Sequence, residues 1–214
     1  MRRLIHLVFS PTSRLARLML GEKRLAVDPQ AADDATAHLP VFVDLDGTRC
    51  EGLWAIVDHL EGAYPENPLV PEDAAARGEV LRWLDWTNAI LHERVTRKIV
   101  YEKANPRFTG GLTRSTPDMN VIRSGRDALR EVLATTGKAV EERGNLAGRV
   151  CTLADLALAA HLSALDYFGE VPWDSHATMR EWYVRVKSRP SFRSLLADRV
   201  PGQPPVSQYA ELDF

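Results

Sequence analysis

Cysteine is scarce in this chain of 214 residues, which contains only Cys50 and Cys151. The two lie far apart in the sequence and fit neither a CxxC motif nor the ligand spacing of a zinc site. We therefore expect reduced thiols, as is typical of cytoplasmic proteins, and no disulfide framework. The six histidines are scattered as well, so the sequence predicts no metal site.

The chain also lacks long hydrophobic runs and an excess of charge of one sign. The apolar stretch at residues 153–165 is too short to span a bilayer, and the run at residues 4–9 is too short for a signal peptide. Lysine and arginine number 27 against 29 aspartates and glutamates, a net charge of −2 that creates no strong field toward nucleic acid or membranes. We expect a cytoplasmic protein with no transmembrane segment and no nucleic-acid partner.

The most informative stretch lies between residues 38 and 60. Residues 40–43 are apolar β-formers, Asp46-Gly47 suits a tight hairpin turn, and residues 48–50 return as a second short strand. A helix follows, and its predicted apolar side carries Leu53, Trp54, Ile56, Val57 and Leu60. This order of elements on its own is an ordinary ββα unit.

The first twenty residues supply a second feature. Residues 4–9 form an apolar strand, residues 10–13 a polar turn, and residues 14–20 an amphipathic helix in which Arg14 and Arg17 lie opposite the apolar face. Together with the proline strand and hairpin that follow, this opening resembles the thioredoxin-like half of the cytosolic glutathione transferases.

That resemblance implies a role for the residues around the proline. In the family this proline is cis, and the residue before it offers its backbone to glutathione. Leu39 and Pro40 match those positions, so we expect a cis Leu39–Pro40 bond at a glutathione site. The link at residues 28–37 is shorter than the family's loop and helix at this point, which help to hold the glycine end of glutathione.

Proline also marks the domain boundary. Three prolines between residues 65 and 71 predict a linker. We predict an α/β thioredoxin-like domain at residues 1–66, an all-α domain at residues 72–200, and a C-terminal tail at residues 201–214, the arrangement of the glutathione transferase fold.

Helix signals are clear beyond the linker. A helical pattern covers residues 77–103, and Thr116-Pro117-Asp118 predicts a helix start with a cap and a proline in the first turn. The sequence Thr152-Leu153-Ala154-Asp155 is a capping box, in which each end of the motif bonds the backbone of the other. The same box opens the central buried helix of the transferases.

The candidate catalytic residue is Ser10. A transferase of the serine type needs a hydroxyl that donates to the glutathione thiolate beside a helix N-terminus, where the helix dipole favours negative charge. Ser10 stands four residues before Arg14 and matches the family's serine. The alternative is that Ser10 is only a turn residue before Pro11, with Ser13 as the helix cap.

The carboxylate end of glutathione has fewer predicted ligands. Family members place a Glu or Gln followed by Ser at the start of the third helix, and this chain has Glu51-Gly52 there. Gly52 has no hydroxyl, although backbone amides at a helix start can still bind an anion. We predict Leu39, Pro40, Glu51 and Gly52 as glutathione-binding residues with weak or absent affinity, and no resident cofactor beyond glutathione as a co-substrate.

The composition of the C-terminal tail predicts that it binds a partner protein. It is rich in proline and ends on acidic and large apolar residues, with Tyr209, Leu212, Asp213 and Phe214 as the candidate contacts. A frayed end is the alternative, and on either reading we expect the loss of residues 209–214 to leave the thermal midpoint almost unchanged. Residues 165–173 and 187–199 and the terminal Leu-Asp-Phe resemble an alphaproteobacterial branch of the family.

Two functions follow from this resemblance. The branch binds the tubulin homologue FtsZ, regulates cell division and works as dimers, which implies a homodimeric FtsZ-binding protein with weak or no transferase activity. The alternative is an active serine-type transferase that uses Ser10 to conjugate glutathione to small electrophiles.

Overall fold

A four-stranded sheet forms the first part of the chain. A computed structural model describes residues 1–32, 38–110 and 116–212. The strands are β1 (Arg2–His6), β2 (Val27–Ala31), β3 (Val41–Val43) and β4 (Arg49–Glu51), in the order β2-β1-β3-β4. β1 pairs parallel with β2 and antiparallel with β3, and β3 pairs antiparallel with β4. With helices α1 (Pro11–Glu22) and α2 (Leu53–Ala63), this confirms the thioredoxin-like prediction.

β2 differs from the sequence prediction. It begins at Val27 and continues through Ala31, so it occupies the first part of the predicted link at residues 28–37. Pro29 is tolerated within it because β2 is an edge strand and needs donors on one side only. The rest of the predicted short link, residues 33–37, lies outside the described residues.

The hairpin between β3 and β4 forms as predicted. Asp46 accepts hydrogen bonds from the Thr48 amide and hydroxyl, both at 2.9 Å, and Gly47 adopts the positive φ of 89° that the turn requires. The Leu39–Pro40 bond that leads into β3 is cis, also as predicted.

The rest of the chain is helical, as predicted. The main helices are α3 (Ala74–Trp86), α4 (Arg97–Lys103), α5 (Met119–Arg143), α6 (Leu153–Tyr167), α7 (Ala177–Lys187) and α8 (Arg193–Leu196). A π-helical segment, Thr87–Thr96, joins α3 to α4, and single 3₁₀ turns occur at Pro106–Phe108, Trp173–Ser175, Pro190–Phe192 and Ser207–Ala210. The last of these lies in the tail, which was expected to have no regular structure.

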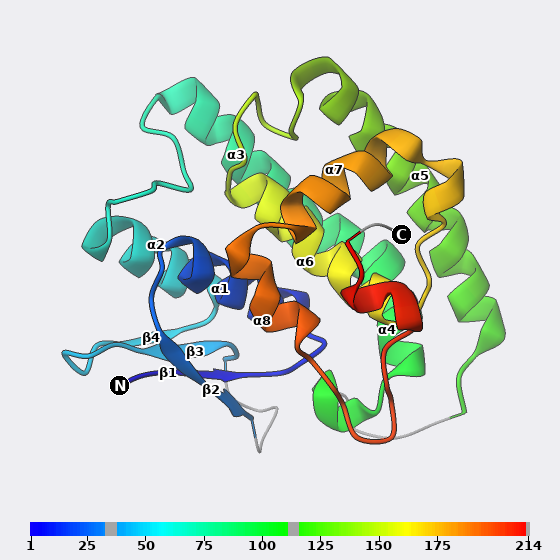
Figure 1. Ribbon diagram of the computed structural model, residues 1–214, viewed down its shortest axis with the longest axis horizontal. Helices are drawn as coiled ribbons and strands as arrows, with labels where there is room; N and C mark the ends of the chain where they lie inside the picture. The colour runs from blue at the N-terminus through cyan, green and yellow to red at the C-terminus, as the bar shows by residue number, and fades with distance from the viewer. Residues whose placement is uncertain (33–37, 111–115, 213–214) are drawn as a thin grey trace.

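Helix α6 lies in the middle of the helical domain (Figure 1), and all of its residues are buried. Its predicted capping box is present: the Thr152 amide donates to Asp155 Oδ2 at 2.9 Å. The Asp155 carboxylate also accepts from the Leu146 amide and the Trp182 indole. One buried carboxylate thus fixes the start of α6 to two neighbouring segments.

Two helix-start predictions need small corrections. Asp73 caps α3, which therefore begins three residues before the predicted start. Asp118 rather than Thr116 caps α5, and Pro117 precedes the helix instead of occupying its first turn. In both cases the nearest carboxylate supplies the acceptor for the free amides.

Two predictions for the first domain are wrong. Trp54 is not on the buried side of α2 but 45% exposed. Arg14 and Arg17 are buried, because α1 packs against α6 and α8 on the side predicted to face solvent. Gly21 lies inside α1, where a Cβ would stand 2.7 Å from the Ser191 Cα. Gly21 therefore permits close helix packing.

Candidate functional site

Ser10 lies at the N-cap of α1 and is mostly buried. Its side chain makes no capping bond, and its hydroxyl instead lies 3.0 Å from the Thr12 hydroxyl. The backbone of Ser10 is fixed, since its amide donates to the Leu7 carbonyl and its carbonyl accepts from the Arg14 amide. The hydroxyl therefore stands beside the positive end of the α1 dipole, the environment that stabilises a thiolate.

Ser13 is not the helix cap that the sequence predicted. It lies within α1, fully buried, and its hydroxyl accepts a hydrogen bond from the Leu7 amide at 3.2 Å. The same side chain thus closes the turn from inside the helix. Of the two serines, Ser10 has the hydroxyl nearer the helix terminus.

The predicted glutathione-binding residues gather where β3 and β4 meet α2. The Gly52 amide donates to the Pro40 carbonyl at 2.9 Å, which ties the cis-proline segment to the helix start. Gly52 is the N-cap of α2 with a φ of 79°, which favours glycine at this position. Glu51 is exposed, and its carboxylate pairs with Arg49 at 2.7 Å.

An anion could bind here through the backbone alone. The first amides of α2, beginning with that of Leu53, have no acceptor within the helix. The N-cap residue Gly52 offers no side-chain hydroxyl beside them, and the Glu51 carboxylate pairs with Arg49. Among the described residues no hydrogen bond joins Ser10 to this group, so the glutathione-binding roles of Leu39, Pro40, Glu51 and Gly52 stay a prediction.

Phe9 forms the helical-domain side of the Ser10 turn, and sequence analysis missed it. Its amide donates to the Phe108 carbonyl at 3.1 Å. Its ring contacts those of Phe108, Tyr167 and Phe168, with centroid separations of 6.2, 4.9 and 5.0 Å. In the sequence, the only local signal for these ring contacts was that an aromatic residue, Phe9, stands next to Ser10.

Arg14 was missed as well, and it is the most connected side chain near the site. The guanidinium is fully buried. It donates to the Ser163 hydroxyl at 2.7 Å, to the Val8 carbonyl at 3.0 Å, to Asp198 at 3.2 Å and to the Tyr209 hydroxyl. Such a charge is stable inside a protein only when its donors are satisfied, as these are.

The structure corrects the prediction that Tyr209 contacts a partner. Its side chain is completely buried, and its ring lies 5.0 Å from that of Tyr167. Burial raises the pKa of Tyr209 to about 12, so the phenol stays protonated and donates to the Leu195 carbonyl at 3.0 Å. Leu212 is 41% exposed, whereas Asp213 and Phe214 lie outside the described residues.

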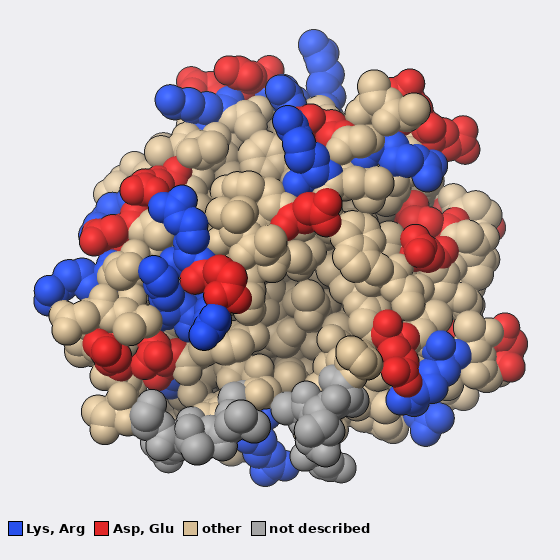
Figure 2. Space-filling view, turned by 180° about the vertical axis from the view of Figure 1, so that it is seen from behind, with Lys and Arg blue, Asp and Glu red and all other residues tan. Residues whose placement is uncertain are grey.

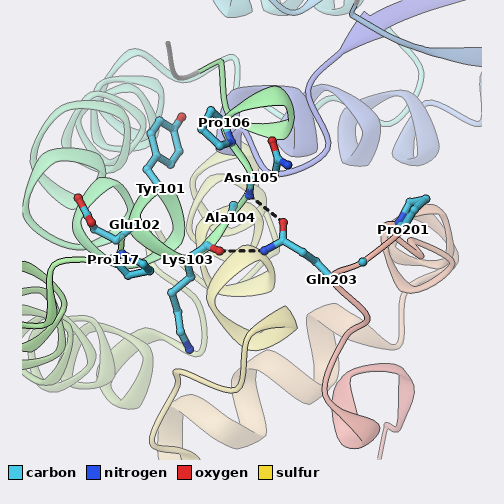
Figure 3. A pocket seen from close by; sticks show the side chains of 10 residues that line it. Tyr101, Glu102, Lys103, Ala104, Asn105, Pro106, Pro117, Pro201 and Gln203 are labelled. Atoms are coloured by element: carbon cyan, nitrogen blue, oxygen red, sulfur yellow. Dashed lines mark hydrogen bonds between the residues drawn. The ribbon is translucent and has the colours of Figure 1, made fainter. Parts of the chain in front are cut away.

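Gln203 fixes the first part of the tail against the end of α4 (Figure 3). Its side-chain nitrogen donates to the Lys103 carbonyl at 2.8 Å, and its side-chain oxygen accepts from the Asn105 amide at 2.7 Å. Its own carbonyl accepts from the Tyr167 hydroxyl at 2.7 Å. The tail is therefore hydrogen-bonded to two helices before it reaches Tyr209.

A cavity of about 430 Å³ lies beside this contact. It is lined by Tyr101, Glu102, Lys103, Ala104, Asn105, Pro106, Pro117, Pro201, Gly202 and Gln203. Figure 3 shows that its walls come from the end of α4, the segment that follows it and the tail. Burial raises the pKa of Tyr101 to about 12, which leaves a neutral phenol in this wall.

Acidic and basic side chains are intermixed on one face of the molecule (Figure 2). They surround a hollowed, mostly uncharged centre. In residues 1–32, 38–110 and 116–212 no three His, Cys, Asp or Glu side chains are grouped as metal ligands would be. No helix in these ranges combines the length and the apolar character needed to cross a membrane.

The two cysteines are free thiols, and Cys50 is buried. Burial raises the pKa of Cys151 to about 12, so this thiol is protonated and a poor nucleophile at neutral pH. Neither cysteine therefore competes with Ser10 as a candidate for chemistry.

Known proteins share this sequence and fold over the full length. FtsZ-localized protein A of Caulobacter vibrioides is 39% identical over 228 aligned residues, which cover 100% of this chain and 98% of that protein. Glutathione S-transferase GstB of Escherichia coli K12 is 25% identical over 151 residues, 67% of each chain. No known family profile matches the chain.

Solved structures with the same fold give the same relationships. A glutathione S-transferase from Rhodospirillum rubrum F11 matches with a TM-score of 0.93 and 38% identity over 100% of both chains. FzlA from C. crescentus matches with a TM-score of 0.93 and 37% identity, over 100% of this chain and 99% of that one. With its thioredoxin-like sheet, cis-proline and buried capping-box helix, the chain belongs to the glutathione S-transferase family.

Proposed function

We propose that this protein is an FtsZ-binding regulator of cell division built on a glutathione transferase scaffold, with weak or no transferase activity. The observation that carries the proposal is the 39% identity to FtsZ-localized protein A over the whole chain, domains and tail together.

The chemistry of the site supports the same proposal. A glutathione carboxylate at the start of α2 would meet only backbone amides, because Gly52 lacks a side chain and Glu51 pairs with Arg49. Hydrogen bonds to a charged ligand contribute about 1.5–3 kcal/mol each, so the missing hydroxyl costs roughly a factor of ten or more in affinity. Ser10 alone does not compensate for this loss.

Co-sedimentation with FtsZ polymers tests the proposal. Full-length protein should pellet with the polymers and stay in the supernatant without them. A chain that ends at Glu211 removes the exposed Leu212 and the last two residues but keeps the buried Tyr209. We expect reduced pelleting of this truncated chain, since lost anchor side chains typically cost about 2 kcal/mol or more of binding energy.

The outcomes separate the two parts of the idea. Equal pelleting of both chains would remove the tail end as a docking element while leaving FtsZ as the partner. No pelleting of either chain would contradict the proposed function itself.

An active serine-type transferase is the second candidate, and the position of Ser10 at the α1 N-terminus favours it. Turnover of glutathione with an aryl halide should then be robust and should disappear in Ser10→Ala. Thr12→Ala is the matched control, because it removes the hydroxyl that faces Ser10 but not the candidate donor. Turnover that Ser10→Ala leaves unchanged would make Ser10 a turn residue only.

We also propose a homodimer. Trp83 and Trp86 contact each other on α3 and stay partly exposed, and Ile90 follows at 44% exposure. Large apolar side chains that remain at the surface together are typical of an interface. Sedimentation equilibrium should give twice the chain mass, and Trp86→Glu should shift it toward the monomer.

A further inference from the structure

The tail and the candidate catalytic turn are held by the same side chain. Arg14 uses one nitrogen to hold the Val8 carbonyl, in the turn that precedes Ser10, and another to hold the Tyr209 hydroxyl in the tail. Its Nε donates to Ser163 of α6, so the guanidinium has a fixed orientation. Arg14 thus joins the turn, the central helix and the tail at one point.

A second path joins the same two segments through aromatic rings. Tyr209 packs on Tyr167 with centroids 5.0 Å apart, and Tyr167 packs on Phe9 at 4.9 Å. Phe9 immediately precedes Ser10, and its amide is bonded to the Phe108 carbonyl. One polar path, through Arg14, and one apolar path, through Tyr167, therefore connect the Ser10 turn to Tyr209.

We propose that Tyr209 and Arg14 are positioning residues, through which the docked tail sets the geometry of the Val8–Ser10 turn. The inference rests on the proposed site at Ser10, but it concerns contacts within this chain and does not require FtsZ binding. When the Tyr209 hydroxyl is removed, Arg14 loses one of its acceptors and can leave Val8. The turn then opens locally while the sheet and helices stay folded.

Hydrogen exchange of the native full-length protein tests this inference. The Phe9 and Ser10 amides are bonded to carbonyls and report opening of the turn. In Tyr209→Phe, which keeps the ring on Tyr167, we expect these amides to exchange about tenfold faster, the effect of one lost hydrogen bond to a charged group. The Asp44 amide, bonded in the β3–β4 hairpin, should keep its rate after correction for global stability.

The chain offers a matched control in Tyr64→Phe. The Tyr64 hydroxyl also accepts from an arginine, Arg2, and donates to the Asp44 carboxylate, so the variant loses the same number of bonds, one of them again to an arginine. This variant should accelerate exchange at Asp44 and leave the Phe9 and Ser10 amides unchanged.

Two results would overturn the inference: wild-type exchange at Phe9 and Ser10 in Tyr209→Phe, or equal acceleration of these amides in Tyr64→Phe. If Tyr209→Phe does not fold, Ser163→Ala serves instead, because it removes the Nε acceptor of Arg14 and should loosen the same turn. A protein that fails to bind FtsZ yet shows the local acceleration would contradict the proposed function and support the positioning role.

Discussion

Replacing Tyr209 with phenylalanine should lower the stability of the whole protein. The hydroxyl accepts a hydrogen bond from Arg14 and donates one to the Leu195 carbonyl at 3.0 Å, and the side chain is completely buried. Sequence analysis predicted that losing residues 209–214 would leave the thermal midpoint almost unchanged. The burial of Tyr209 reverses that expectation.

The magnitude follows from the two bonds. A hydrogen bond to a charged group contributes about 1.5–3 kcal/mol. The lost neutral bond to the Leu195 carbonyl, which still accepts from the Asp198 amide, adds about 1 kcal/mol. Arg14 keeps its bonds to Ser163 and Asp198, so we expect a total loss of about 3 kcal/mol in the free energy of unfolding. For a chain of this size that corresponds to a fall in Tm of roughly 6–12 °C.

Thermal unfolding followed by circular dichroism, together with urea titration, measures this loss. Leu212→Ala in the exposed tail end is the control and should stay within about 0.5 kcal/mol of the parent protein. A Tyr209→Phe midpoint equal to that of the parent would refute the reasoning, because it would mean that the tail is not docked on Arg14 in solution.

Three further predictions concern other parts of the first domain and its contacts. Burial and the nearby Arg17 lower the pKa of His6 from 6.5 to about 4, so the folded protein resists protonation of this imidazole. The free energy of unfolding should therefore fall by up to about 3 kcal/mol as the pH drops from 6.5 to 4. In urea titrations, His6→Gln should remove most of this pH dependence. Asp44 accepts from an arginine, a histidine and a tyrosine in a nearly closed pocket, so Asp44→Ala should destabilise the protein by about 3 kcal/mol, and a loss under 1 kcal/mol in denaturant titrations would show that these bonds are dispensable. Gly21→Ala would place a Cβ 2.7 Å from the Ser191 backbone and should lower the thermal midpoint, whereas the matched Gly137→Ala in α5, whose Cβ would contact only Met179 at 3.5 Å, should leave it unchanged or higher.

The parts of the fold that could be predicted from sequence depend on local signals. The hairpin at Asp46-Gly47 and the capping box from Thr152 to Asp155 place every required group within four residues of one another. The cis Leu39–Pro40 bond was predicted from its place in a familiar order of elements. Such features need no knowledge of what packs against them.

The parts that could not be predicted depend on distant segments. The helical spacing of Arg14 predicts a solvent-facing side chain, yet Arg14 is buried. Its burial is possible because Ser163, Asp198 and Tyr209, from the other end of the chain, accept its hydrogen bonds. The helical spacing of Trp54 predicts a core residue, yet its side chain is 45% exposed. The local sequence around a side chain cannot reveal a partner that lies 149 residues away, as Ser163 does from Arg14.

Calorimetry on the purified full-length chain tests the central claim most directly, with FtsZ polymers and glutathione titrated separately into the same preparation. The account predicts saturable heat with FtsZ and no saturation with glutathione across its millimolar range. Saturable binding of glutathione without any heat from FtsZ would contradict it and would identify a transferase that uses Ser10.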